Sequence, residues 1–510
     1  MEIKMLKIPA FVPVSNGFYT CFAKDEFKQY SLDTDEVVFK PLNDDYTVTL
    51  NGQPIQVREC RVSAYPFNRP WPGKQRPFKQ SESAGFISFE ADEAVELRVK
   101  KNTPFTSAKV RPTSKNITPV IEGDEIVFTL TKQGGYVLEV DGMHHALHIF
   151  FNGIREEAKP EDVTLYYGPG IHFPGNINLR DNDIVYIHPE AIVFGSLTTT
   201  GAKNVRVFGG GVIDGSQEER ITEHCYENHT KGNVRLYNAE NVSIEDIILV
   251  NSASWCLALF DCDTINIQNV KIVGQWRYNT DGIDICNTSN VSIKDCFIRS
   301  FDDSITLKGI YDCQKPMHNV KADNCVIWCS WGNTCEVGIE TWVTEIFDVE
   351  FSNIDVIHTA GPALAVMNGC NAKIHDITYR NINVEFCKDQ LPMKHQKREY
   401  QDYDPEGTPG YQILFDAGNQ QYPVRTKTTE AVIRTVPQPL GVINGVHLEN
   451  VNAITDDESI KPAMRVFCHG GRENIQNLTF KNLSLNGVKQ EDLSGFDLQV
   501  HGGDAPKIVE

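Results

Sequence analysis

Three aspartates at two points of the chain have the residue type and the spacing for acid–base chemistry. The segment Asn279-Thr280-Asp281-Gly282-Ile283-Asp284 is followed, 21 residues after Asp281, by Asp302-Asp303-Ser304-Ile305-Thr306-Leu307-Lys308. Carboxylates that are crowded together repel one another, which raises the pKa of at least one and leaves an acid beside a base. Cleavage of a glycosidic bond requires such a pair. The alternative is that these are corner aspartates with no role in catalysis, which is less favoured for three or four acids at one level.

Aromatic and polar side chains surround the aspartates in sequence. Trp276, Tyr278 and Trp331 bracket them and are candidates for stacking on sugar rings, although tryptophans in a chain of this size can all be packing residues. The polar candidates for substrate contact are Asn279, Arg277, Lys308, Asn333 and Glu340. For Glu340, a surface or corner position without function is an equally good interpretation.

One hexapeptide pattern, apolar–x–apolar–x–Asn/Asp–apolar, recurs from about Val242 onward. Its flanking residues are apolar with period two, which indicates short strands. We interpret the polar column as a ladder of side chains at a corner of a repeating coil, with a structural role only. The polar member falls at Asp246, Asn269, Asp295, Asn324, Asn353, Asn381, Asn450 and Asn482, at spacings of 23 to 32 residues except for one of 69.

A strand-rich repeat of this length predicts an all-β fold built on a right-handed parallel β-helix, in which like residues of successive coils stack about 4.8 Å apart. A leucine-rich solenoid is disfavoured because its LxxLxL frame is missing. The interval between Asp281 and Asp302 is close to one coil, so these aspartates and Asp303 should share one face on neighbouring coils.

The solenoid is expected to occupy residues 156–510 as the catalytic domain. Residues 1–155 carry alternating strands at Tyr46–Leu50, Val95–Val99, Glu125–Thr129 and Tyr136–Val140, which predict an N-terminal β-sandwich domain. A long insertion near 388–437, rich in charge, Tyr, Pro and Gly, is either a lid or cleft wall or a plain surface loop.

Three segments together resemble a known family. Asn279-Thr280-Asp281-Gly282, Asp302-Asp303 with Ile305 and Lys308, and Gly211-Val-Ile-Asp-Gly215 are similar to the signature of the polygalacturonases, glycoside hydrolase family 28, and of the related dextranase and isopullulanase family 49. The likeness covers roughly residues 160–390. It implies a β-helix that cleaves glycosidic bonds of a carbohydrate with inversion and needs no metal or cofactor. By position it implies Asp302 as the general acid and Asp281 and Asp303 as the water-activating base.

Two departures from the polygalacturonase pattern bear on the substrate. Asn333 stands where those enzymes have the His of Gly-His-Gly, and their Arg-x-Lys, which grips the galacturonate carboxylate, has no counterpart in Ala363-Leu-Ala-Val-Met-Asn368-Gly. The sequence therefore favours a neutral or differently decorated sugar, closer to family 49. Arg277 could still bind an acid, so uronates are not excluded.

Two other classes of function remain open. A β-helix polysaccharide lyase would need calcium ligands and a basic proton acceptor, for which Arg277 and Lys308 are candidates. A non-catalytic carbohydrate-binding or adhesin-like solenoid would have no need of stacked aspartates. An unsaturated product that absorbs in the ultraviolet would indicate the lyase, and any hydrolysis that is lost on replacing Asp302 would exclude the binding solenoid.

Composition limits the partners and the location. The 510 residues carry a net charge of −20, which repels nucleic acid and acidic membranes. No apolar run approaches the roughly 20 residues of a membrane span, and no signal peptide is visible, so the chain is expected to be cytoplasmic, or secreted if a leader was removed. The 14 cysteines show no zinc-type spacing and are interpreted as buried free thiols. The sequence does not indicate an oligomeric state.

Overall fold

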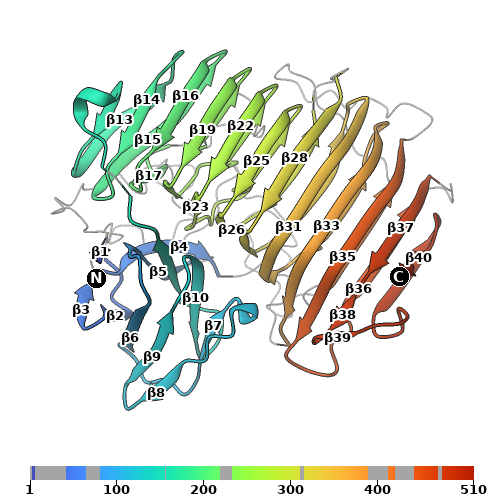
Figure 1. The fold of residues 1–510 in the computed structure, drawn as a ribbon, viewed down its shortest axis with the longest axis horizontal. Helices are drawn as coiled ribbons and strands as arrows, with labels where there is room; N and C mark the ends of the chain where they lie inside the picture. The colour runs from blue at the N-terminus through green and yellow to red at the C-terminus, as the bar shows by residue number, and fades with distance from the viewer. Residues whose placement is uncertain are drawn as a thin grey trace, which may run out of the picture.

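The computed structural model describes residues 3–5, 42–64, 81–155, 157–218, 232–310, 315–388, 412–419, 441–468 and 474–510. Two β-sheet bodies account for nearly all of them, and only two 3-10 turns, Thr113–Lys115 and Pro160–Asp162, are described as helical. Figure 1 shows the larger body as a row of parallel strands that runs from β13 (Gly170–Asn178) to β40 (Asp497–His501), with the smaller body against one side. The predicted fold class is confirmed.

The smaller body is a sandwich of two mostly antiparallel sheets. The strands expected from the sequence form here as β2, β6, β9 and β10. A shared core that includes Val48, Leu97, Phe128, Phe89 and Ile149 joins the sheets, because alternate side chains of each sheet point toward the other. One sheet contains β1 (Lys4–Met5), β4 (Arg58–Ser63), β5 (Ser81–Glu90), β7 (Ala108–Arg111), β10 (Gly134–Val140) and β11 (Leu147–Asn152). The other contains β2 (Tyr46–Leu50), β3 (Gln53–Ile55), β6 (Val95–Lys101), β8 (Val120–Glu122) and β9 (Glu125–Leu130).

The larger body is a parallel β-helix whose coils present three faces. The first face contains β12 (Leu165–Tyr167), β14 (Ile184–Ile187), β16 (Lys203–Phe208), β19 (Glu240–Glu245), β22 (Asp263–Gln268), β25 (Ser289–Lys294), β28 (Met317–Asp323), β31 (Glu345–Thr359), β33 (Lys373–Phe386), β35 (Val442–Thr455), β37 (Ile475–Lys481) and β41 (Lys507–Val509). The second contains the first halves of β13 and of β15 (Ala191–Thr200), β17 (Val212–Asp214), β20 (Ile248–Val250), β23 (Lys271–Ile272), β26 (Phe297–Ser300), β29 (Val326–Cys329), the later halves of β31, β33 and β35, and β38 (Ser484–Leu485). The third contains the later halves of β13 and β15, β18 (Val234–Tyr237), β21 (Leu257–Phe260), β24 (Ile283–Cys286), β27 (Ile305–Gly309), β30 (Cys335–Thr341), β32 (Leu364–Asn368), β34 (Ile413–Asn419), β36 (Ala463–Cys468) and β40.

The predicted asparagine ladder lies at the corner between the first and second faces. Asn381 Nδ2 donates to Asn353 Oδ1 at 2.9 Å, and Asn450 Nδ2 donates to Asn381 Oδ1 at 2.8 Å. Asn381 has a φ of 55°, in the left-handed region that Asn tolerates better than most residues. The sequence pattern therefore marks a backbone requirement, and its interpretation as structural is supported.

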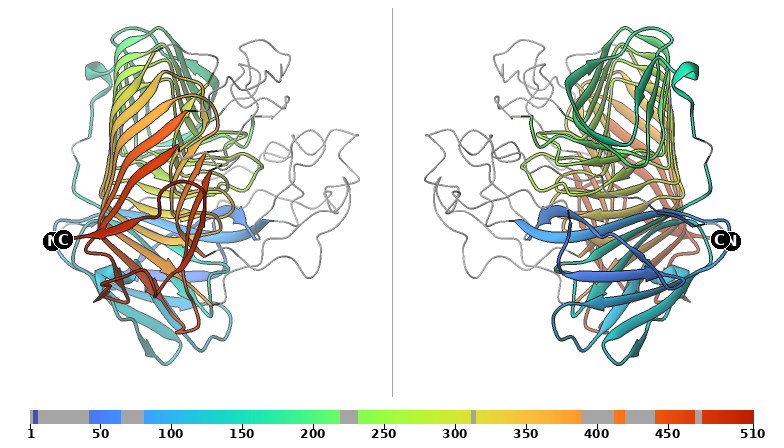
Figure 2. Two further views of the ribbon diagram at one scale, coloured as in Figure 1. Left: turned by 90° about the vertical axis from the view of Figure 1, so that its right-hand side faces the viewer. Right: turned by 90° about the vertical axis from the view of Figure 1, so that its left-hand side faces the viewer.

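The sandwich packs on the second face. Phe150 of β11 lies 5.2 Å from Phe297 of β26, measured between ring centroids. Polar contacts cross the same interface: Lys271 Nζ donates to Asn152 Oδ1 at 2.5 Å, and Arg299 Nη1 donates to His148 Nε2 at 3.0 Å. Figure 2 looks along the stack of coils and shows the sandwich below it in both views. The apolar contacts of the sandwich are made with the second face and not with the third face, which carries the aspartates.

The expected insertion near 388–437 is in part a strand of the solenoid and in part lies outside the described residues. Within the expected insertion, β34 is a solenoid strand that pairs with β32 and β36, so residues 413–419 belong to a coil. The rest of 389–440 lies outside the described residues, apart from its edges next to β34.

Eleven of the cysteines are described, and all are free and buried, as predicted.

Candidate active site

The three predicted catalytic aspartates meet at the turn between the second and third faces. Gly282 N donates to Asp303 O at 2.7 Å, and Ser304 N donates to Asn333 O at 2.8 Å. Equivalent positions on three successive coils are therefore occupied by Asp281, Asp303 and Asn333. The interval of about one coil between the aspartates predicted this proximity. Asp302 precedes Asp303 on the middle coil and is 5% exposed.

The ammonium of Lys308 lies at the centre of the carboxylates. Its Nζ is 2.9 Å from Asp281 Oδ2, 3.0 Å from Asp284 Oδ1 and 3.2 Å from Asp303 Oδ2. The same nitrogen lies 4.4 Å from the centroid of a ring of Trp255, a cation–π distance. Lys308 is 3% exposed and its pKa is raised well above the usual value because the carboxylates outweigh the opposing effect of burial. It is a counter-ion to the aspartates instead of the substrate contact expected from the sequence.

Asp302 has a different environment from the other aspartates. Asn279 Nδ2 donates to its Oδ2 at 3.0 Å, and the Asp303 backbone N donates to its Oδ1 at 3.2 Å. No ion pair joins Asp302 to Lys308 in the described structure. Burial raises the pKa of Asp302 well above its usual range, and the negative charge of Asp303 raises it further. This carboxyl is thus the one best placed to hold a proton.

Two further carboxyls next to Lys308 also have raised pKa values. Burial raises the pKa of Asp281 well above its usual range, against the opposing charge of Lys308. Burial raises the pKa of Asp284, which is fully buried on β24, to about 6. One lysine cannot neutralise this many carboxylates, so the cluster retains at least one proton near neutral pH.

Position 332 requires glycine because Asp302 and Asp303 lie too close to its backbone for a side chain to fit. A Cβ on Gly332 would lie 2.4 Å from Asp303 N and 2.6 Å from the Oδ1 atoms of both Asp302 and Asp303. These two carboxylate oxygens are therefore no more than twice that distance apart. No side chain at position 332 fits without moving them.

Asn333 and two glutamates complete the polar part of the site on the coil after Asp303. The Asn333 backbone N donates to Asp303 Oδ1 at 3.0 Å, so the residue that replaces the family's histidine fixes a candidate base. Glu336 on β30 is 2% exposed, and Thr306 Oγ1 donates to its Oε2 at 3.4 Å. Burial raises the pKa of both Glu336 and Glu340.

The aromatic candidates divide into two groups. Trp331 is partly exposed and stacks on Phe301 at 5.8 Å with the ring planes within 6°, and partly exposed Tyr278 lies 6.0 Å from Trp331. Trp276 is 1% exposed and therefore presents no free ring face, contrary to the expectation of sugar stacking. Arg277 is also 1% exposed, and it donates to Ser216 O and Glu218 O.

Asp284, Glu336 and Trp255 were not predicted as site residues from the sequence. Asp284, Thr306 and Glu336 stand side by side on β24, β27 and β30. An acidic residue between two apolar neighbours, as in Ile283-Asp284-Ile285, is the signal that could have revealed an outward carboxylate on a buried strand. The described residues contain no group of three or more His, Cys, Asp or Glu side chains arranged to hold a metal ion.

The residues of β32 that point away from the solenoid core do not include a cationic pair like the Arg-x-Lys of polygalacturonases. Leu364 and Val366 point into the solenoid core, so Ala365 and Met367 point outward. Both outward residues are apolar, whereas the polygalacturonase pattern has Arg-x-Lys in this part of the chain.

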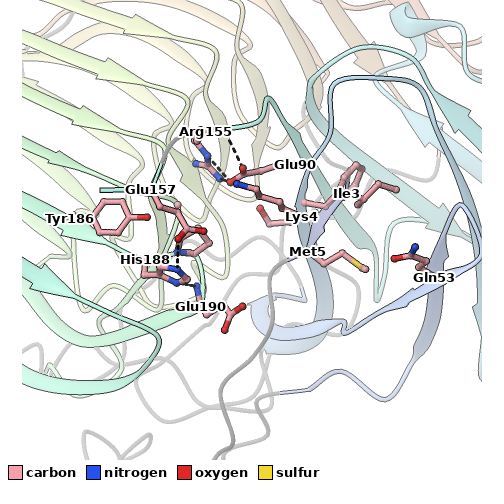
Figure 3. A pocket seen from close by; sticks show the side chains of 15 residues that line it. Ile3, Lys4, Met5, Gln53, Glu90, Arg155, Glu157, Tyr186, His188 and Glu190 are labelled. Carbon is pink, nitrogen blue, oxygen red and sulfur yellow. Dashed lines mark hydrogen bonds and ion pairs between the residues drawn. The ribbon is translucent and has the colours of Figure 1, made fainter. Parts of the chain in front are cut away.

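A separate cavity of about 490 Å³ lies between the sandwich and the first coils, and none of the candidate catalytic residues lines it. Figure 3 shows Arg155 directed at Glu90 and His188 directed at Glu157 within it. Arg155 Nη2 lies 2.6 Å from Glu90 Oε1, and its Nη1 lies 3.3 Å from Asp246 Oδ1. Arg155 is thus already neutralised by Glu90 and Asp246.

Comparison with known proteins matches the part of the chain that carries the aspartates. The family model for glycosyl hydrolases family 28 matches residues 163–414, which include the whole carboxylate cluster. The chain resembles this family over 252 of its 510 residues. It is 27% identical to rhamnogalacturonase A of Emericella nidulans over 162 residues, 31% of this chain and 30% of that protein. It is 28% identical to rhamnogalacturonase B of Aspergillus niger over 162 residues, 31% of this chain and 27% of that protein.

The match thus spans less than a third of the length of these curated relatives. Among solved structures, Dex49A from Penicillium minioluteum has a TM-score of 0.58 and 14% identity, and the match covers 92% of this chain and 88% of that one. The chain therefore shares its overall fold with that protein. The part of the chain that the structure describes contains no helix that is long and apolar enough to cross a membrane. The cytoplasmic location expected from the sequence is not supported by these relatives.

Proposed function

We propose that this chain is a family 28 enzyme that hydrolyses glycosidic bonds of an oligosaccharide or polysaccharide, with Asp302 as the general acid. The observation that carries the proposal is the unequal environment of the aspartates. Asp302 is buried beside an asparagine amide, whereas Asp281 and Asp303 are in contact with the Lys308 ammonium. An acid must hold its proton at the start of the reaction, and a base must have lost its own.

Asp303 and Asp281 are the base in this proposal. The Lys308 ammonium lies within 3.2 Å of an oxygen of each carboxylate and opposes the rise that burial causes in the pKa of Asp281. The Asn333 backbone N–H holds one Asp303 oxygen. Asp303 has a side chain that is 17% exposed, so a water molecule can reach it more readily than the fully buried Asp281. We infer that Asp303 accepts the proton of the attacking water and that Asp281 helps to orient that water.

Inversion at the anomeric carbon is proposed from the family. The neighbouring oxygens of Asp302 and Asp303 are closer than the separation of about 6.5–9.5 Å that is typical of inverting carboxylate pairs, so distance does not support it. Proton NMR of the first-formed product gives the anomeric configuration directly.

Lyase chemistry is disfavoured by the state of the two candidate bases. The raised pKa of Lys308 keeps it protonated, and Arg277 donates to two backbone carbonyls, so neither residue is suited to accept a proton. This supports hydrolysis over elimination.

The test is Asp302→Asn assayed on two substrates of the same sugar. On an ordinary glycoside we expect kcat to fall by several orders of magnitude, because the leaving oxygen no longer receives a proton. On a glycoside whose leaving group needs no proton, the same variant should retain much more of its rate. Asp303→Asn is the matched control and should lose both substrates alike, since water activation is still required. Equal losses in Asp302→Asn would overturn the assignment.

A further inference from the structure

The cavity between the sandwich and the first coils is separate from the aspartate cluster. Both bodies line it: β1 and β5 of the sandwich contribute Lys4 and Glu90, and β14 of the solenoid contributes Tyr186. Its volume of about 490 Å³ is in the range of cavities that hold small organic molecules. The strand β14 lies three coils before β22, which belongs to the coil of Asp281, so the two sites are about 14 Å apart along the stack.

The hydroxyl of Tyr186 is a donor that makes no hydrogen bond with any residue that the structure describes. The ring is packed between Tyr166 and Phe208, at centroid distances of 5.5 and 5.2 Å, and the residue is 1% exposed. Figure 3 shows the hydroxyl directed into the cavity, toward Glu157 and His188. Burial and the charge of Glu157 raise the pKa of Tyr186 to about 12, so the hydroxyl keeps its proton at neutral pH. Buried donors are nearly always paired, and this one is reached through the cavity that it lines.

His188 and Glu157 form a donor and an acceptor with room for a hydroxyl group between them. The Glu190 backbone N donates to His188 Nδ1 at 3.0 Å, so the ring proton of the neutral imidazole is on Nε2. His188 Nε2 lies 3.8 Å from Glu157 Oε2, beyond the roughly 2.7–3.2 Å of a direct hydrogen bond. A hydroxyl group donates and accepts at once, so it can accept from His188 and donate to Glu157.

The charges around the cavity favour a neutral ligand. Arg155 donates from Nε and Nη2 to Glu90 Oε1, at 2.9 and 2.6 Å, so its charge is already matched. The carboxylates of Glu157 and Glu190 would repel an anion, and the ammonium of Lys4 would repel a cation. Because donors and acceptors are both present, a ligand that can only donate or only accept would leave part of them unpaired. A polyhydroxylated neutral molecule satisfies both kinds.

We propose that this cavity is a second, non-catalytic binding site and that it holds a neutral sugar ring, with hydroxyl groups bonded to Tyr186, His188 and Glu157. Ile3 and Met5 of β1 add apolar surface on the sandwich side, which suits the C–H face of a sugar. The inference goes beyond the hydrolysis proposed above and does not depend on it, because binding here is measurable in a protein that cleaves nothing.

The first test is the binding of methyl glucoside, methyl galactoside and methyl mannoside to Asp302→Asn protein, followed by saturation-transfer NMR titration. We expect at least one of the three to bind with a Kd on the order of 1 mM. Tyr186→Phe should weaken that binding about 5- to 10-fold, because it removes one hydrogen bond and leaves the packed ring in place. Glu157→Gln should weaken it by a similar factor, since the amide is a poorer acceptor than the carboxylate.

Tyr167→Phe and Glu161→Gln are the matched controls. Tyr167 packs against the solenoid core and Glu161 lies in the turn Pro160–Asp162, and neither lines the cavity. Both controls should bind the sugar as the parent protein does. The two cavity variants should also melt at the parent temperature, because the side chain of Glu157 is 59% exposed and the ring of Tyr186 is retained.

A free sugar and the end of a long glycan offer the same chemistry, and kinetics of the active enzyme distinguish them. If a glycan chain reaches the cavity, Tyr186→Phe should raise KM for the best long glycan about fivefold and leave kcat, and the KM of a short oligosaccharide, unchanged. If only free sugars enter, KM changes for neither substrate while the methyl glycoside still binds. Binding without hydrolysis of any glycan would refute the proposed function and leave this site standing.

Inorganic phosphate and methylammonium serve as the anionic and cationic probes in the same titration, and neither should bind as tightly as the sugar. The proposal fails if either probe binds more tightly than all three glycosides. It also fails if none of the glycosides binds, or if Tyr186→Phe and Glu157→Gln bind them as tightly as the controls do.

Discussion

Lys308 Nζ lies 2.9 Å from Asp281 Oδ2, on the neighbouring coil, and makes no ion pair with Asp302 in the described structure. One ammonium is thus shared by Asp281, Asp284 and Asp303 while the remaining buried carboxyl is held by an amide and a backbone N–H. This unequal sharing gives Asp302 a different environment from that of Asp281, Asp284 and Asp303. Lys308 opposes the rise that burial causes in the pKa of Asp281 and of Asp284.

Lys308→Met should inactivate the enzyme. Without the ammonium, the carboxylates that contact it repel one another and take up protons, so we expect kcat to fall at least about 100-fold. The free energy of unfolding should fall by about 3–5 kcal/mol near pH 8 and by less near pH 5, where protonation relieves the repulsion. Steady-state assays and urea denaturation at both pH values measure these effects.

Lys203→Met is the control for that variant. Lys203 forms an exposed ion pair with Glu240 on the first face, which should contribute less than about 1 kcal/mol. Wild-type kcat in Lys308→Met would show that the lysine only fills space.

Gly332→Ala should disable the site while leaving the solenoid folded. The added methyl would meet Asp303 N and both carboxylates at distances that no real Cβ contact has, so the aspartates must move. A displacement of this size in a catalytic constellation typically costs about 100-fold in rate. Gly495→Ala is the control, because its Cβ would closely approach only the end of the flexible Gln490 side chain and would meet Leu485 at an ordinary contact distance of 3.5 Å. Full activity in Gly332→Ala would contradict the tight placement of Asp302 and Asp303.

Asp284 should make the protein less stable as the pH rises from about 4 to 7. Burial raises its pKa in the folded protein to about 6 from 3.8, so the folded state binds more protons than the unfolded state between these values. The free energy of unfolding therefore decreases with rising pH in this window. The stabilisation is complete below the unfolded pKa and is lost as the pH passes the folded pKa.

Relative to Asp284→Asn, the wild type should lose about 3 kcal/mol of unfolding free energy between pH 4 and pH 7. Denaturant unfolding of both proteins across that range measures the difference, and Asp497→Asn at an exposed position of β40 controls for the loss of one carboxylate. A pH-independent difference between wild type and Asp284→Asn would show that the folded pKa is not raised.

Homogeneous polygalacturonate should be a poor substrate. Its sugars carry a carboxylate at every position, and the outward residues Ala365 and Met367 of β32 offer none of the cationic contacts that polygalacturonases use there. We expect kcat/KM at least about tenfold lower than for glycans that carry uronates at only some positions. Release of reducing sugar from a panel of glycans measures it, and equal turnover of polygalacturonate and the best other glycan would refute the prediction.

The repeat length and the placement of the three aspartates could be predicted from the sequence. A parallel β-helix brings residues one coil apart into adjacent strands, so the interval from Asp281 to Asp302 was enough to predict their proximity. The Asn and Asp corner column was equally visible, because a left-handed backbone position favours these residue types wherever it recurs. The strands of the sandwich followed from period-two alternation.

The direction of side chains at the turns was decided only by the tertiary structure. Trp276 and Arg277 directly precede the aspartates in sequence, but the turn between β23 and β24 buries both, because side chains in an irregular turn follow no fixed period. Lys308 was recognisable as part of the motif, yet its role as a shared counter-ion depends on three distances across two coils.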